Sequence, residues 1–381
     1  MIERTIEMKF SIDKNAFLSK LTVAQKAMAA KSNMPALTGI LISVAKGELV
    51  FVASNMDISI KTLTKHPSLK IESEGVCLVP GKLFTDIIRK LGGDTVNIEL
   101  EDDNVLRIMA GSSDITLNLL DVADYPKPQF DFSEHPIVLK AADLKDIIKE
   151  TTFASSSVEN KPILTGVNIR IYDNKLLAVS TDSFRLSKRN MTLADNYLET
   201  NVIIPSRSLN ELSRIIEDSI DKVEIYLDKN KVLFKFDDII FQSRLLEGNY
   251  PDTSKLIPTN FPVILKFNKD SLIEAIDRVS TLSSNPNATS IVKLQIEANG
   301  TINLISNSPE LGTIKDTVSP VEVVTMNEIK ISFSSTFFLD ALKAFSSPEV
   351  FVKFTGEIRP FIFEADNDPG LVELVLPMKS E

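Results

Sequence analysis

The sequence of 381 residues is 43% hydrophobic and 25% charged, a composition typical of globular proteins, and its length suits two or three domains. The single cysteine, Cys77, excludes an intrachain disulfide. A net charge of −10 argues against a surface that binds nucleic acid throughout, although a local patch can have the opposite sign.

The N-terminal segment and the hydropathy pattern indicate where the protein resides. Residues 1–7 are charged where a signal peptide needs an apolar core. No apolar run approaches the roughly 20 residues that are needed to span a bilayer. We therefore expect a soluble, cytoplasmic protein.

The first third of the chain is predicted to begin with a short strand over 10–12 and a helix within 13–31. Phe17, Leu21 and Ala24 recur there at the spacing of a helix with one apolar face. Two strands joined by a hairpin turn follow, over 40–44 and 49–53. A second helix is predicted over 82–91, and its apolar face is expected to carry Leu83, Ile87, Ile88 and Leu91.

The middle and last thirds repeat this order of strand, helix, strands, helix and strands. The same periodicities predict elements over 137–139, 141–150, 167–171, 176–179, 208–217 and 231–236, and then over 263–265, 269–278, 292–296, 302–305 and 336–345. Two proline-rich segments without periodicity separate the thirds, at 126–136 and 251–262, and are predicted to be linkers.

Short motifs recur at a matching spacing. Pro-Ala-Leu-Thr-Gly-Ile at 35–40 returns as Pro-Ile-Leu-Thr-Gly-Val at 162–167, and the last third has lost this motif. Pro-Gly-Lys at 80–82 is matched by Pro-Ser-Arg at 205–207, and the Tyr-Pro step at 125 returns at 250. A period of this length is close to the size of a domain. We predict three repeated α+β domains with antiparallel sheets, over residues 1–128, 129–254 and 255–381.

Candidate catalytic groups are few. His66 and His135 each precede a proline, no zinc spacing is present, and no glycine-rich phosphate loop occurs. The acidic run at 99–103 suits a solvated strand end, and Thr181-Asp182-Ser183 suits a structural turn better than a nucleophile site. The residues favour a binding role without metal or cofactor. A metal-dependent hydrolase that uses Asp102 or Asp182 stays open as an alternative, as does a scaffold that binds only proteins.

The repeat, the order of elements and several motifs together resemble the bacterial DNA sliding clamp, the beta subunit of DNA polymerase III holoenzyme. Met8-Lys-Phe-Ser-Ile is similar to the usual start of that family, so residues 1–7 would be an extension. The segment 161–167 is similar to its second domain. Residues 181–187 resemble its Thr-Asp-Gly-His-Arg-Leu motif, 247–252 its Gly-Arg-Phe-Pro-Asp, and 375–379 its Val-Met-Pro-Met-Arg.

The resemblance implies a non-enzymatic processivity factor, a closed ring of two head-to-tail protomers with helices around duplex DNA and sheets outside. The six helical segments of this chain sum to +3, which leaves −13 for the rest, and the first repeat supplies nearly all of the excess. Weak backbone contacts of this kind suit sliding without base readout. The side chains expected to face DNA are Lys20, Lys26, Lys31, Lys82, Arg89, Lys149, Arg207, Arg214 and Arg278.

The resemblance also implies a groove between the second and third domains, which captures short peptides from polymerases, the clamp loader and repair proteins. Phe184 stands where the family often has histidine, after Ser183 in place of glycine, so we expect it to narrow the groove or change which peptides fit. For ring closure, Ile115 and Leu117 on an edge strand would meet Leu282 of the other protomer. The expected groove residues are Leu164, Thr181, Arg185, Leu186, Pro251, Leu256, Ile358, Pro360, Val375, Leu376, Pro377 and Met378.

Overall fold

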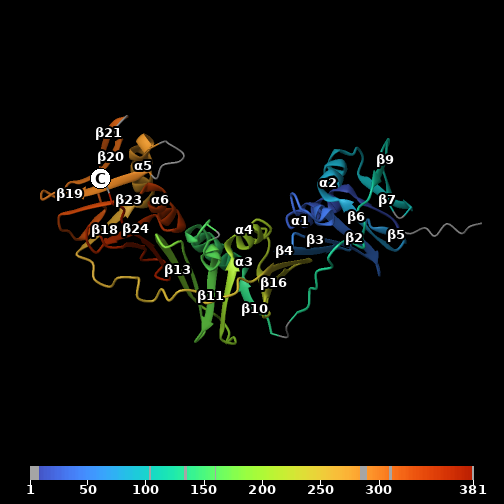
Figure 1. Ribbon diagram of the computed structural model, residues 1–381, viewed down its shortest axis with the longest axis horizontal. Helices are drawn as coiled ribbons and strands as arrows, with labels where there is room; N and C mark the ends of the chain where they lie inside the picture. The colour runs from blue at the N-terminus through green and yellow to red at the C-terminus, as the bar shows by residue number, and fades with distance from the viewer. Residues whose placement is uncertain are drawn as a thin grey trace, which may run out of the picture. The chain divides into compact units, whose positions relative to one another are not determined.

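The computed structural model describes residues 8–102, 104–132, 135–158, 160–283, 290–308 and 311–379 (Figure 1). These residues form six α-helices, four short 3-10 helices and 26 strands in four antiparallel sheets. No helix among them is long and apolar enough to cross a membrane. The extension expected at residues 1–7 and the acidic residue Asp103 lie outside the described residues.

The contacts divide the chain into two compact units, of which the first is Met1–Leu144 with Glu211–Leu245. It holds a five-stranded sheet in the order β5-β1-β7-β8-β9 and an eight-stranded sheet in the order β10-β15-β16-β17-β4-β3-β2-β6. The strands are β1 (Lys9–Asp13), β2 (Gly39–Ala45), β3 (Glu48–Ser54), β4 (Ile58–Thr64), β5 (Lys70–Ser73), β6 (Gly75–Pro80), β7 (Thr95–Asp102), β8 (Val105–Ala110), β9 (Ser113–Asn118), β10 (Ile137–Lys140), β15 (Lys222–Leu227), β16 (Lys231–Phe236) and β17 (Ile239–Arg244).

The second unit is Lys145–Asn210 with Leu246–Glu381. It holds a nine-stranded sheet in the order β14-β11-β12-β13-β26-β25-β24-β18-β22 and a four-stranded sheet in the order β21-β20-β19-β23. The strands are β11 (Gly166–Tyr172), β12 (Lys175–Thr181), β13 (Arg185–Thr192), β14 (Thr200–Pro205), β18 (Val263–Asn268), β19 (Ile291–Ile296), β20 (Ile302–Ser308), β21 (Gly312–Val318), β22 (Glu322–Thr325), β23 (Ile329–Ser334), β24 (Glu349–Phe354), β25 (Phe361–Glu364) and β26 (Leu371–Val375).

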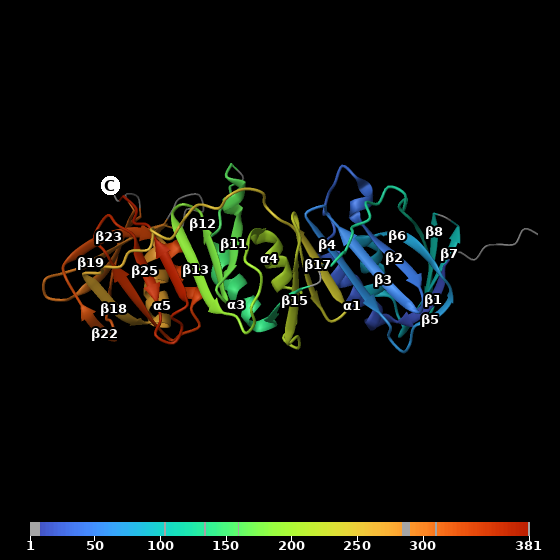
Figure 2. The same cartoon turned by 90° about the horizontal axis from the view of Figure 1, so that it is seen from below.

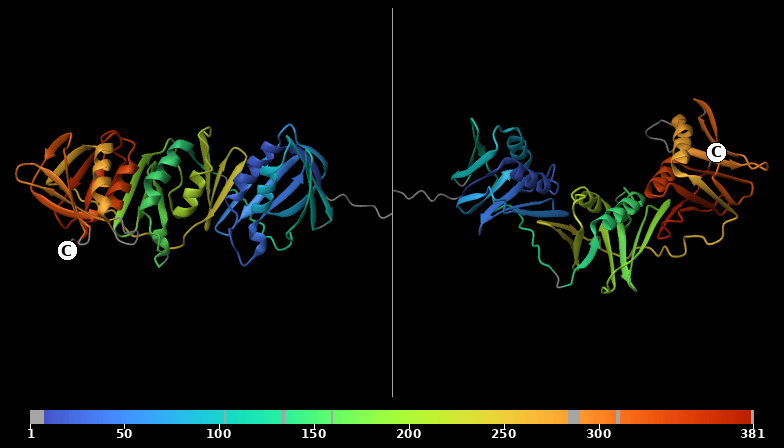
Figure 3. Two further views of the ribbon diagram at one scale, coloured as in Figure 1. Left: turned by 90° about the horizontal axis from the view of Figure 1, so that it is seen from above. Right: turned by 180° about the vertical axis from the view of Figure 1, so that it is seen from behind.

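The helices come in pairs, as the periodicity predicts, and they cover the sheets. Within the first unit α1 packs against α2, β3 and β4, and within the second α5 and α6 lie side by side (Figure 3). Phenylalanine fills these cores in a chain without tryptophan: the Phe17 ring contacts Phe51 and Phe84, and the Phe333 ring stacks on Phe338. The helices are α1 (Lys14–Gln25), α2 (Gly81–Lys90), α3 (Ala141–Thr151), α4 (Ser206–Ser213), α5 (Lys269–Ser280) and α6 (Ser335–Ala344).

The repeated sequence motifs have the same conformation in both copies. Pro35–Thr38 and Pro162–Thr165 each form a short 3-10 helix, η1 and η3, in which the threonine hydroxyl donates to the proline carbonyl. The glycine that follows begins a strand, and a β-carbon there would collide with the strand beside it. Each glycine lies opposite the proline of the second repeated motif, Gly39 opposite Pro80 and Gly166 opposite Pro205. The two 3-10 helices and the two strands that follow them therefore confirm that this segment is duplicated.

Two helices end earlier than the periodicity predicts. α1 ends at Gln25, because the amides of Lys26 and Ala27 bond to carbonyls three residues back and close the last turn. Lys31 therefore lies in the loop that follows the helix. α4 ends at Ser213 for the same reason, since the amide of Ile215 donates to the carbonyl of Leu212.

The buried face of α2 also differs from the prediction. Leu83 is 53% exposed, whereas Phe84 and Ile88 are fully buried. The inward positions are Gly81, Phe84, Thr85 and Ile88. Ile88 and Leu91 are buried as predicted, whereas Phe84 takes the inward position predicted for Leu83. The aromatic side chain takes the inward position because its ring packs edge-on against Phe17.

Two sheets run without a break across the predicted domain boundaries. β4 pairs antiparallel with β17 in the first unit (Figure 2), and β13 pairs antiparallel with β26 in the second. We call these pairings the first and the second seam. They bring strands of neighbouring repeats into direct backbone contact, which the repeat itself does not predict.

Candidate functional site

A small apolar cluster crosses the second seam and is covered by the linker that follows β17. Its buried members are Leu186 of β13 and Leu374 of β26, with Val179 and Ile362 from the strands on either side. Tyr250, Ile257, Phe261 and Leu376 pack against it. This arrangement forms an apolar surface on one face of the nine-stranded sheet, and two of the predicted groove residues, Leu186 and Leu376, belong to it.

The turn between β12 and β13 lies beside this cluster and is held by its own side chains. Thr181 Oγ1 donates to the carbonyl of Arg185 at 2.6 Å, and Asp182 Oδ1 accepts from the amide of Phe184 at 2.9 Å. Tyr250 Oη accepts from the Thr181 amide at 3.0 Å, and burial raises the pKa of this tyrosine. Asp182 therefore acts as a hydrogen-bond acceptor that shapes the turn.

Arg185 is not a free cation at the edge of a pocket. Its guanidinium donates to Asp182 Oδ2 at 3.0 Å and to Asp340 Oδ2 of α6 at 2.6 Å, and it lies over the Phe337 ring at 4.4 Å from the centroid. Its side chain is only 12% exposed. Two carboxylates compensate its charge, so it is placed to present a fixed, planar surface rather than an unpaired charge.

The other predicted groove residues fall into three groups. Leu164 and Val375 are buried, and Val375 belongs to the large core of the C-terminal part. Leu376 is bonded through its amide to the carbonyl of Phe184 at 2.9 Å, which places Phe184 at the edge of the cluster. The remaining members lie in the linker, in the β24–β25 loop and after β26, and they are Pro251, Leu256, Ile358, Pro360, Pro377 and Met378.

Three large apolar side chains of this region are open to solvent. Phe184 is 60% exposed, Leu256 is 52% exposed and Ile358 is 89% exposed. The motif comparison missed several side chains of the cluster itself. The alternation of apolar residues along β12 and β26 could have found Leu177, Val179, Val372 and Leu374. It could not have found Ile362 of β25 or the linker residues Tyr250, Ile257 and Phe261.

The basic side chains expected to face DNA are mostly exposed. Lys20 is half-buried and pairs with Asp238 across the first seam, while Arg89 and Arg214 pair with carboxylates one turn away on their own segments. Five further basic residues lie on the helices or just after them: Lys26, Lys31, Lys82, Lys149 and Arg207. Within the described parts of the chain, no carboxylate lies within 4 Å of their charged groups.

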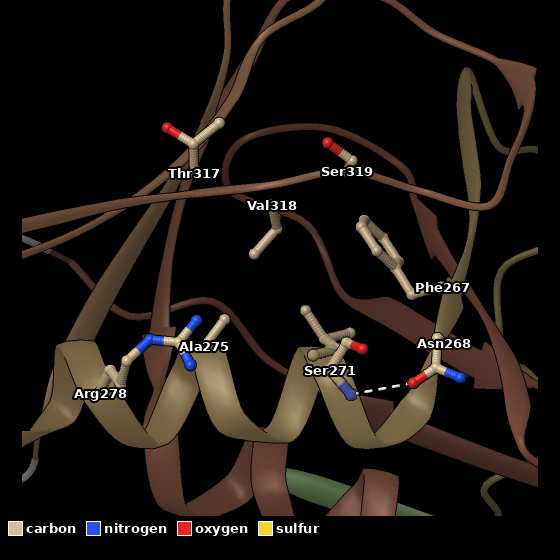
Figure 4. Close-up of a pocket in the computed structure, with 9 residues that line it drawn as sticks. Phe267, Asn268, Ser271, Ala275, Arg278, Thr317, Val318 and Ser319 are labelled. Carbon is tan, nitrogen blue, oxygen red and sulfur yellow. Dashed lines mark hydrogen bonds between the residues drawn. The ribbon is translucent and has the colours of Figure 1, made fainter.

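Arg278 lines a pocket of about 150 Å³ between α5 and β21 (Figure 4). Its guanidinium donates to Asp316 Oδ2 at 2.9 Å, and the apolar floor is formed by Phe267, Leu272 and Val318. No predicted groove residue lines this pocket. Its position places Arg278 beside the outer strand of the four-stranded sheet.

Each of the four sheets has an outer strand at either end, and two of these outer strands carry or adjoin the predicted interface residues. β9 is an outer strand of the five-stranded sheet, and β21 is an outer strand of the four-stranded sheet. Ile115 and Leu117 lie on β9, and Leu282 lies in the short helix η4 (Thr281–Ser283), which packs against β20 and β21. The Arg107 guanidinium lowers the pKa of Asp114 on β9 through a hydrogen bond. The predicted interface residues thus lie on or beside unpaired edges.

Three family models match consecutive parts of the chain. They are described as the N-terminal, central and C-terminal domains of the DNA polymerase III beta subunit, and they match residues 8–129, 138–252 and 254–379. A relative from Staphylococcus epidermidis named Beta sliding clamp is 38% identical over 378 residues, which cover 98% of this chain and 100% of the relative.

Solved structures agree with this assignment. The DNA polymerase sliding clamp from Bacillus subtilis has a TM-score of 0.93 and 36% identity, covering 98% of this chain and 100% of that chain. A C. crescentus beta sliding clamp, described with PEG bound to a putative beta-motif tethering region, has a TM-score of 0.91 and 27% identity over 98% of this chain and 99% of that chain. The chain therefore belongs to the DNA polymerase III beta subunit family, the bacterial sliding clamps, and it is a processivity factor of DNA replication.

Proposed function

We propose that two copies of this chain close head to tail around duplex DNA and tether polymerases and other partners through the apolar surface at the second seam, without catalysing a reaction. The observation that carries this proposal is the pair of open edges on β9 and β21. These edges correspond to the strands that pair at the two internal seams. The proposed domains are residues 1–128, 129–254 and 255–381. The proposed location is the cytoplasm, where a factor that works on the bacterial chromosome is needed.

The positions of β21 and β9 in their repeats support strand pairing between copies. β21 follows β20 as β4 follows β3 and β13 follows β12, and a lysine marks the same register position in each hairpin: Lys61, Lys188 and Lys315. β9 follows β8 as β17 follows β16 and β26 follows β25. β21 is thus equivalent to β4 and β13, and β9 is equivalent to β17 and β26. The pairs β4–β17 and β13–β26 already form seams, which leaves β21 and β9 as the third pair.

The registers of the internal seams predict the register between copies. Ile60 faces Phe241 at the first seam, and Ser187 faces Glu373 at the second. The equivalent positions on the open strands are Ile314 and Ile115, so these two isoleucines would face each other across the ring interface. Opposed β-branched side chains stabilise an antiparallel pair, and closure removes two edges that would otherwise invite aggregation.

The apolar cluster at the second seam suits capture of a short peptide. Exposed apolar side chains stand on segments next to its members: Phe184 before β13, Leu256 beside Ile257 in the linker, and Ile358 in the loop before β25. Large apolar side chains dominate the binding energy of such surfaces. The ligand described for the C. crescentus clamp lies in a region named for tethering, which supports a binding role for the corresponding surface here. The exposed lysines and arginines near the helices would contact phosphates weakly and without sequence preference.

A cysteine cross-link tests the ring and its register. The native Cys77 is buried, so engineered pairs report with little background. Ile115→Cys combined with Ile314→Cys should form a disulfide between copies, because directly opposed Cβ atoms lie about 4.5–5.5 Å apart, and a small shift of the strands brings them to the roughly 3.5–4.5 Å of a disulfide. The cross-linked ring should then stay on circular DNA and leave after the DNA is cut once. The measurement is non-reducing electrophoresis followed by gel filtration on circular and linear DNA.

The matched control moves one cysteine by a single residue, Ile115→Cys with Thr313→Cys, which places the two thiols on opposite faces of the sheet. It should cross-link far more slowly. Equal retention on circular and linear DNA would contradict the ring, whereas equal cross-linking of both pairs would contradict only the register.

A further inference from the structure

The second seam contains a buried carboxyl group at a position where the first seam is apolar. Glu373 of β26 is 1% exposed and faces Ser187 of β13, which is also buried. The corresponding residues of the first seam are Ile60 and Phe241, and both are fully buried. The same structural position therefore holds two hydrocarbon side chains in one seam and a carboxyl–hydroxyl pair in the other.

The buried carboxyl group of Glu373 shares the hydroxyl of Ser187 with a second acceptor. Ser187 Oγ lies 2.5 Å from the backbone carbonyl oxygen of Glu150 and 2.8 Å from Glu373 Oε1. Ser187 has one hydroxyl proton, and both the carbonyl of Glu150 and Glu373 Oε1 accept from it, so the two oxygens compete for a single donor. An ionised Glu373 would therefore be a buried charge with only a shared donor, whereas a protonated carboxyl group carries no charge to compensate.

Burial and the groups around this pair together favour the protonated form of Glu373. Burial raises the pKa of Glu373 well above its usual value, the nearby Glu150 raises it further, and Ser187 and Arg185 lower it. Glu150 of α3 is itself 4% exposed, and burial raises its pKa to about 7. Arg189 of β13 lies 3.4 Å from the Glu150 carboxylate, but its guanidinium also pairs with Asp368.

The outer members of the network complete the set of charges that face Glu150. Asp146 raises its pKa and Lys149 lowers it, both from the same helix. One carboxylate oxygen of Glu150 and the Nε of Arg189 have no hydrogen-bond partner among the described residues. The cluster therefore holds more acid than its cations neutralise.

We propose that the second seam is a pH-sensitive joint, which stays closed while Glu373 carries its proton and opens as that proton is lost, whereas the first seam does not respond to pH. Opening of the strands lets water reach the carboxylate, so ionisation favours the open form. The linkage has a definite sign: the closed seam is most stable below pH 4.5, the ordinary value for glutamate, and weakens as the pH rises toward the folded value. The inference does not depend on ring closure.

Hydrogen exchange of the full chain tests this joint with the first seam as an internal control. Peptides covering β13 and β26 are compared with peptides covering β4 and β17 between pH 5.5 and 8.5, after correction for the intrinsic pH dependence of exchange. Opening that releases one proton should speed exchange at the second seam on the order of tenfold per pH unit until the folded pKa is passed. The corrected rates at the first seam should stay constant.

Variants identify the responsible group. Glu373→Gln keeps a donor for Ser187 but cannot ionise, so the second seam should lose its pH dependence. Glu328→Gln, at an exposed site, should keep the wild-type profile. If the first variant does not fold, Ser187→Ile with Glu373→Phe recreates the apolar pair of the first seam. Parallel pH profiles at the two seams of the wild type would overturn the proposal, as would an unchanged profile in Glu373→Gln.

Discussion

At the scale of single residues, the turn that leads into β13 combines hydrogen bonding with backbone strain. Ser183 has a φ of +80°, in the left-handed region that favours glycine, and its amide donates to Thr181 Oγ1 at 3.1 Å. The bonds from Thr181 and Asp182 hold this conformation in place. The resemblance noted in the sequence puts glycine at this position in the family, so the serine is a strained choice that the turn tolerates.

Replacing Ser183 with glycine should therefore stabilise the protein. We expect Ser183→Gly to raise the free energy of unfolding by about 0.5–1 kcal/mol, because relief of left-handed strain outweighs the added entropy of the unfolded chain. Urea denaturation measures the change. Ser346→Gly is the control, since this exposed serine has an ordinary φ, and it should lower stability slightly. Equal losses of unfolding free energy in both variants would contradict the inference that the backbone at Ser183 is strained.

At the scale of elements, hydrophobic periodicity identified the six α-helices of the described residues, but it did not decide which face of α2 is buried. Leu83 and Phe84 are neighbours in sequence and differ by 100° around the helix axis. The amphipathic pattern accommodates either face. Packing against Phe17 of α1 selects the face that carries the larger ring.

Truncations of these neighbours should separate the two faces of α2. Phe84→Ala should cost about 3–5 kcal/mol of stability, because it removes a fully buried ring and leaves a cavity. Leu83→Ala should change stability by less than about 0.5 kcal/mol, since that side chain is 53% exposed. Urea denaturation of both variants provides the comparison. A large loss in Leu83→Ala would restore the face predicted from the sequence.

At the scale of the whole molecule, net charge and local charge have opposite signs. The chain carries −10, yet the segments that form helices carry a small positive excess. The structure divides the basic side chains into two kinds: Lys20 is committed to an ion pair with Asp238 across the first seam, whereas Lys31 and Arg207 are exposed. Only the second kind is available to phosphates, so contacts with DNA should be few and sensitive to salt.

Charge reversal at the exposed positions should weaken the proposed contact with DNA. We expect Lys31→Glu with Arg207→Glu to shorten residence on circular DNA and to reduce its dependence on salt, because each lost phosphate contact removes about one released counterion. Single-molecule residence times at several salt concentrations measure this effect.

The control carries the same change in net charge at two hairpin turns, Lys46→Glu with Lys175→Glu, where both lysines are exposed. It should leave residence unchanged. Equal effects of the two double variants would mean that net charge rather than position matters, and no effect of either would favour a scaffold that binds proteins without encircling DNA.

The sequence by itself determined the repeat, the α+β class and the family resemblance. These features are encoded locally: the Leu-Thr-Gly step specifies a short 3-10 helix followed by a strand, and apolar periodicity specifies each helix and strand over a few residues. Leu186 and Leu376, which contiguous motifs assign to the predicted groove, belong to or pack against the apolar cluster at the second seam.

Only the tertiary structure decided the properties that depend on residues distant in the chain. The charge of Arg185 is compensated by Asp340, which lies 155 residues away, and the buried carboxyl group of Glu373 accepts from Ser187, which lies 186 residues away. No local pattern specifies such pairs, since periodicity reports which face of an element is apolar but not what that face meets. The sequence therefore established three copies of one fold, and packing between them made one seam apolar and the other titratable.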